Sequence, residues 1–62
     1  MAIVMKVRRY LARTGMAPTL FGRRAVNDPR LVGDLLNGRQ PRPETVARID
    51  AFMARHPKGG AR

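Results

Sequence analysis

Apolar residues recur along the chain at the spacing of a helix, and no stretch alternates apolar and polar residues as a half-buried strand would. Prolines and glycines divide this pattern into four segments. The sequence therefore predicts an all-α protein. Its four short helices are expected at about residues 3–14, 18–24, 28–37 and 43–55, in one domain spanning residues 1–56, with a disordered basic tail at residues 57–62.

The third segment has the clearest signals for where a helix begins and ends. Asp28 is a favoured N-cap residue, and Pro29 suits the first helical position because an N–H there would have no helical partner. Asn37 and Gly38 mark the end of the helix. Gly33 in the middle is unexpected, because glycine within a helix costs roughly 0.5–1 kcal/mol relative to alanine.

Basic residues strongly outnumber acidic ones. The chain has thirteen lysines and arginines and four acidic residues, which gives a net charge of +9. Eleven of the thirteen basic residues are arginine. A field of this sign attracts polyanions, which are nucleic acids first and anionic membranes second. Arginine also fits phosphate groups and guanine edges with two parallel hydrogen bonds, so its excess over lysine favours nucleic acid.

The inventory of reactive side chains argues against an enzyme. The chain has no cysteine and no serine, His56 is its single histidine, and its acids number four. Nucleophilic catalysis and metal-dependent hydrolysis need several such groups within reach of one another. We therefore expect no catalytic residues, no cofactor and no metal site.

The predicted second and third helices are separated by only about three residues, Ala25-Val26-Asn27, which is the spacing of a helix-turn-helix motif. Gly22 is followed by Val32 ten positions later and by Leu35 thirteen positions later. In these features, residues 3–55 resemble DNA-binding domains of the lambda repressor and Cro type. In that family, a small residue at the position of Gly22 permits close crossing of the two helices.

The turn departs from the family pattern at two positions. The family often has glycine four residues after the small residue, where this chain has Val26, and an apolar residue next, where it has Asn27. Asparagine tolerates the left-handed backbone conformation that glycine adopts in such turns. We therefore expect a turn that is packed differently or is one residue longer.

The resemblance implies that helix 28–37 is a recognition helix, which enters the major groove of DNA. Four apolar side chains of this helix are expected to face the core: Leu31, Val32, Leu35 and Leu36. The opposite stripe then carries the expected base contacts, which are Arg30, Gly33, Asp34 and Asn37.

Each polar residue of this stripe has its own expected partner. Arg30 is the expected bidentate contact to guanine, and Asn37 is expected to contact adenine or phosphate. The carboxylate of Asp34 either accepts a hydrogen bond from a cytosine amino group or pairs with Arg30 four residues earlier. The alternative without DNA is a solvated Arg30–Asp34 pair, worth a few tenths of a kcal/mol.

Phosphate contacts are expected from side chains that flank the motif. Such contacts fix the register of a protein on DNA and carry little sequence information. A hydroxyl near the start of the second helix can act together with the neighbouring amides. The expected residues are Thr19, Arg23, Arg24, Arg39 and Arg42.

These features favour a transcriptional regulator that binds double-stranded DNA sequence-specifically, as a homodimer on half-sites about one helical turn apart. The dimer surface is expected on helix 43–55. Three alternatives remain: an architectural DNA-binding protein, a cationic amphipathic membrane-surface peptide, and a helical protein-interaction module such as an antitoxin or co-regulator subunit. No export signal or apolar span of about 20 residues is evident, which predicts a cytoplasmic protein and no membrane partner.

Overall fold

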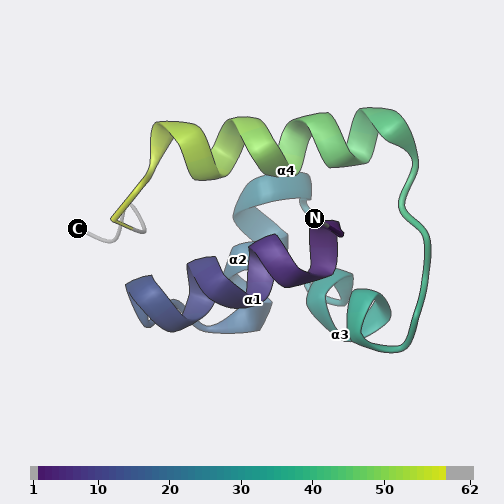
Figure 1. The fold of residues 1–62 in the computed structure, drawn as a ribbon, viewed down its shortest axis with the longest axis horizontal. Coiled ribbons are helices and arrows are strands. Elements are labelled where there is room, and N and C mark those ends of the chain that lie inside the picture. Colours follow the sequence, from purple (N-terminus) through teal and green to yellow (C-terminus); the bar gives the residue numbers. More distant parts are fainter. Residues whose placement is uncertain (1, 59–62) are drawn as a thin grey trace.

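The computed structural model of this chain describes residues 2–58. It contains four helices, which are α1 (Ile3–Thr14), α2 (Pro18–Val26), α3 (Leu31–Leu36) and α4 (Pro43–Arg55) (Figure 1). No strand occurs in the described part, so the predicted all-α class with four helices is confirmed. None of these helices is long and apolar enough to cross a lipid bilayer. Most of the predicted tail, residues 59–62, lies outside the described residues.

Helix α3 begins three residues later than predicted. Residues 28–30 form a turn, in which the Leu31 N–H donates to the carbonyl oxygen of Asp28 at 3.2 Å. The Asp28 carboxylate accepts a hydrogen bond from the Arg30 N–H at 3.0 Å, as an N-cap side chain does, but regular helix starts only after this turn. The predicted helix 28–37 is therefore reduced to six helical residues, Leu31–Leu36.

Helix α2 extends two residues beyond its predicted end, to Val26. Asn27 follows it in the left-handed conformation, with φ 58° and ψ 36°, and donates its N–H to the carbonyl oxygen of Arg23. Asparagine is among the few residues that adopt this conformation readily, so it ends the helix as glycine would. The turn is thus displaced by one residue from the position where the resembled family often has glycine.

The end of α3 is fixed by a Schellman motif, as the Asn37-Gly38 pair predicts. Gly38 has φ 91°, and its N–H donates to the carbonyl oxygen of Leu35 at 3.1 Å. The Arg39 N–H donates to the carbonyl oxygen of Asp34 at 3.0 Å. These two hydrogen bonds satisfy carbonyl groups that have no donor within the helix, and the chain reverses beside α3.

Three aromatic rings from three helices meet at the centre of the core. The ring centroids of Tyr10 in α1 and Phe21 in α2 lie 5.4 Å apart, and Phe52 in α4 lies 5.5 Å from Phe21 in an edge-to-face arrangement. Such geometries add to the free energy gained by burying the rings. The core comprises Val7, Tyr10, Met16, Phe21, Ala25, Leu31, Val32, Leu35, Ile49 and Phe52.

Helices α1 and α4 run in the same direction across the molecule (Figure 1). Polar contacts advance in step along α1 and along α4 with the two residues that follow it. Lys6 pairs with Asp50 at 3.7 Å, the Tyr10 hydroxyl donates to the carbonyl oxygen of His56 at 2.5 Å, and Arg13 donates to the carbonyl oxygen of Pro57 at 3.4 Å. These contacts hold α4 against α1, while an extended segment carries the chain from α3 to α4.

Candidate nucleic-acid interface

Helices α2 and α3 pack closely because residue 22 has no side chain. A Cβ atom placed on Gly22 would overlap with the carbonyl oxygen of Asp28 and lie 3.2 Å from the Leu31 Cβ. The Asp28 N–H also donates to the carbonyl oxygen of Gly22 at 3.0 Å, so the turn lies directly on α2. The absence of a side chain at Gly22 thus sets the distance between α2 and α3. It also determines which face of α3 points away from α2.

The outer face of α3 carries the expected stripe of polar and small residues. Arg30, Gly33 and Asn37 are exposed, and Asp34 is partly buried. A Cβ on Gly33 would meet no other atom within 4 Å, so neither packing nor an unusual backbone conformation requires a glycine there. Its absent side chain leaves the α3 backbone open to a surface approaching from outside.

The apolar side of α3 is narrower than predicted. Leu31, Val32 and Leu35 are buried, as expected, but Leu36 is 57% exposed. The three buried residues occupy the side of this short helix that faces the core, and Leu36 lies at the edge of that side. The expectation that Leu36 faces inward is therefore wrong.

The Arg30–Asp34 pair, one of the two alternatives expected for Asp34, does not form among the described residues. Asp34 instead accepts a hydrogen bond from Arg39, with 2.9 Å between Oδ2 and Nη1, and these atoms form an ion pair. The reversal of the chain at Gly38 brings Arg39 back beside Asp34, a neighbour that helical spacing does not indicate. Both side chains are partly exposed, so the pair adds little stability; its effect is to neutralise the carboxylate on the surface of α3.

The expected phosphate-contact residues are all exposed, but they form two separate groups. Thr19 lies near the start of α2, and Arg23 and Arg24 lie in its last turn. Arg39 and Arg42 lie on the segment between α3 and α4 and border a common hollow. None of the three α2 residues lines that hollow.

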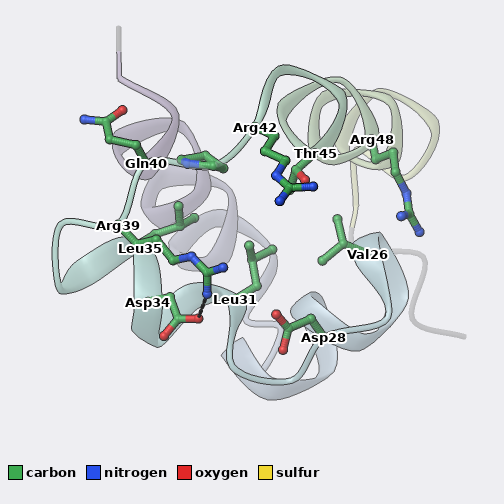
Figure 2. Close-up of a pocket in the computed structure, with 11 residues that line it drawn as sticks. Val26, Asp28, Leu31, Asp34, Leu35, Arg39, Gln40, Arg42, Thr45 and Arg48 are labelled. Carbon is green, nitrogen blue, oxygen red and sulfur yellow. Dashed lines mark hydrogen bonds and ion pairs between the residues drawn. The ribbon is translucent and has the colours of Figure 1, made fainter.

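This hollow has a volume of about 420 Å³ and lies between α3, the turn after α2 and the first turns of α4 (Figure 2). Asp28 and Asp34 line it, together with three arginines, Arg39, Arg42 and Arg48. Sequence reasoning missed Arg48. Arg42, Thr45 and Arg48 recur at every third residue, which indicates that they lie along one side of a helix. This spacing does not indicate whether that side of the helix faces α3.

No family model, curated protein or solved structure matches this chain. Its function is therefore inferred from the geometry and charge described above. Those features are an exposed polar stripe on α3, a glycine that fixes the packing of α3 against α2, and two separate groups of exposed arginines.

Proposed function

We propose that this protein is a sequence-specific double-stranded DNA-binding transcriptional regulator of the lambda repressor and Cro type, with α3 as its recognition helix. The observation that carries the proposal is the exposed stripe of Arg30, Gly33 and Asn37 on a helix seated against α2 through Gly22. The net charge of +9 supplies the attraction for a polyanion.

The proposal divides the contacts with DNA into two kinds. Arg30 leads α3 into the major groove and donates to a guanine edge. Its side chain is available for this contact because it has no ion-pair or hydrogen-bond partner among the described residues. Asn37, one turn beyond Gly33, contacts adenine or phosphate. The exposed cations of α2 and of the α3–α4 segment contact phosphates and set the register.

Asp34 needs a separate account, because an isolated carboxylate next to DNA is repelled by phosphate. Its ion pair with Arg39 removes most of that repulsion. The remaining acceptor capacity of the carboxylate suits a cytosine amino group in the groove. Asp34 then disfavours base pairs that present an acceptor at that position.

We propose that the protein acts as a homodimer, with one half-site read by each copy. The expected dimer surface, the apolar stripe of α4, is largely occupied within one chain. Ile49 is 0% exposed and Phe52 is 4% exposed. Within residues 2–58, the large apolar side chains left exposed are Met5, Leu20 and Leu36, which lie on the other three helices.

Selection of bound duplexes from a random DNA pool tests the proposed function. A regulator selects a defined sequence, and a dimer selects two copies of it in inverted order, about 10 base pairs apart. Competition with unrelated duplex in rising salt then separates the classes. Affinity that falls equally for all sequences indicates an architectural protein. The absence of duplex binding excludes both DNA-binding classes and leaves a protein-interaction module or a membrane-surface peptide.

Gly33→Ala tests whether the missing side chain serves DNA binding. We expect a more stable protein, by up to about 0.5–1 kcal/mol, because alanine favours the helix and meets no neighbouring atom. We also expect weaker binding to the selected duplex, because the added methyl group separates the helix from the groove. Thermal unfolding and fluorescence anisotropy measure the two effects, and unchanged binding would show that residue 33 lies away from the DNA.

Asp34→Asn tests the neutralised carboxylate. The change frees Arg39 and raises the net charge by one, from +9 to +10, so we expect tighter binding to unrelated duplexes and a salt slope steeper by about one. Discrimination at one base pair should fall. The matched control is Asp50→Asn, which removes the same charge and frees Lys6 on the α1–α4 side of the molecule. Equal behaviour of the two variants would place Asp34 outside the interface.

A further inference from the structure

The hollow between α3 and α4 has more positive than negative side chains in its lining. Three arginines and two aspartates line it, which gives a formal net charge of +1. Asp34 forms an ion pair with Arg39, and the Asp28 carboxylate accepts a hydrogen bond from the backbone N–H of Arg30. Figure 2 shows Arg42 and Arg48 along the α4 side of the hollow, opposite the Asp34–Arg39 pair.

Arg42 and Arg48 are the two cations of the hollow that remain unpaired within the described residues. Neither makes an ion pair or a side-chain hydrogen bond there. Both are exposed, and Thr45 lies between them in sequence on the same side of α4. Two guanidinium groups without partners that line one hollow raise its positive potential, and an anion in the hollow is attracted to both.

The hollow also adjoins the outer face of α3. Successive residues of a helix are rotated by about 100°, so Asp34 lies between the exposed stripe that contains Arg30 and the side that contains Leu31. Asp34 and Leu31 both line the hollow. In the proposed binding mode, a strand of DNA that borders the groove occupied by α3 would therefore pass the mouth of the hollow.

We infer that this hollow receives a backbone phosphate of the DNA and that Arg48, together with Arg42, holds it. The inference rests on the proposed function and extends the contact surface from the helix-turn-helix onto α4. One phosphate carries a charge of −1, which matches the net charge of the hollow. Cations of α2 and cations of α4 then both contact the DNA backbone.

Arg48→Gln in the full chain tests the contact, with binding measured by fluorescence anisotropy on a selected duplex and on an unrelated duplex. We expect the affinity for both to fall by about eightfold at about 0.1 M salt, and the salt slope to decrease by about one. Sequence discrimination should stay unchanged, because a phosphate contact carries no base information. Circular dichroism and thermal unfolding check that the fold is retained.

Arg55→Gln is the matched control. Arg55 lies seven residues after Arg48, on the same side of α4 and about 10 Å further along the axis, and it does not line the hollow. We expect it to bind DNA like the unchanged protein. Equal binding by the Arg48 and Arg55 variants would overturn the inference while leaving the proposed function intact. If the unchanged protein binds no duplex, the proposed function itself fails.

A double-mutant cycle with the DNA locates the phosphate. Single methylphosphonate substitutions remove one charge at a time from the backbone of the selected duplex. At one position per half-site, the substitution should weaken DNA binding by the unchanged protein more than binding by Arg48→Gln, because one of the two partner charges is already absent in the variant. Additive effects at every position would contradict a direct contact between Arg48 and a phosphate.

Discussion

Gly22→Ala is expected to remove most of the stability of this domain. The added Cβ would overlap with the backbone carbonyl oxygen of Asp28, so relief requires movement of α3 or of the turn itself. Overpacking a core costs about 1–3 kcal/mol and more where backbone has to move. A chain of 62 residues has a total stability of only about 3–9 kcal/mol at typical values per residue.

Urea unfolding followed by circular dichroism measures this effect. We expect a midpoint lowered by more than half, or a protein already unfolded without denaturant. Gly33→Ala is the matched control, because residue 33 is helical and a Cβ there meets open space. If Gly22→Ala were as stable as the unchanged protein, α2 and α3 could not be packed as closely as described.

Arg30→Ala is expected to abolish discrimination at one base pair of the selected sequence. A bidentate arginine contact to guanine accounts for about 1–3 kcal/mol of preference over other bases. Arg30 precedes the first residue of α3 and is exposed, so its truncation removes no core contact. Stability should therefore stay unchanged while the affinity for the selected duplex falls towards that for unrelated DNA.

Arg23→Ala is the comparison that separates base reading from charge. Arg23 lies on α2, is exposed and has no side-chain partner among the described residues. Loss of the Arg23 side chain should lower the affinity for all DNA sequences alike and reduce the salt slope by about one. Binding of both variants to duplexes with each base pair replaced in turn provides the measurement. If the two variants show the same profile, Arg30 does not read a base.

The starts and stops of the helices were predicted well where one residue type has a local effect. Gly15 and Gly38 end α1 and α3 in the left-handed conformation, and Pro18 and Pro43 begin α2 and α4. The start of α3 was predicted less well. Asp28 was predicted as the N-cap, but Arg30 occupies that position and the Asp28 carboxylate accepts a hydrogen bond within the preceding turn. Whether the residues after Asp28 form a helix or a turn depends on how that segment lies against α2.

The candidate site was predicted in part. The exposed stripe on α3 follows from helical spacing, which the sequence displays directly. The partner of Asp34 does not, because Arg39 reaches it only after the chain reverses at Gly38. Arg48 was missed for a related reason: its helix is separated from α3 in sequence, and packing alone makes the two helices border one hollow.

The sequence by itself determined the helical class, the number of helices, the excess of positive charge and the stripe of α3 that faces outward, because each depends on local spacing or on composition. Only the tertiary structure decided which cations meet which carboxylates, how closely α2 and α3 approach at Gly22, and that α4 shares a hollow with α3. These features join residues from different helices, and their distances depend on the packing of the whole core around Tyr10, Phe21 and Phe52.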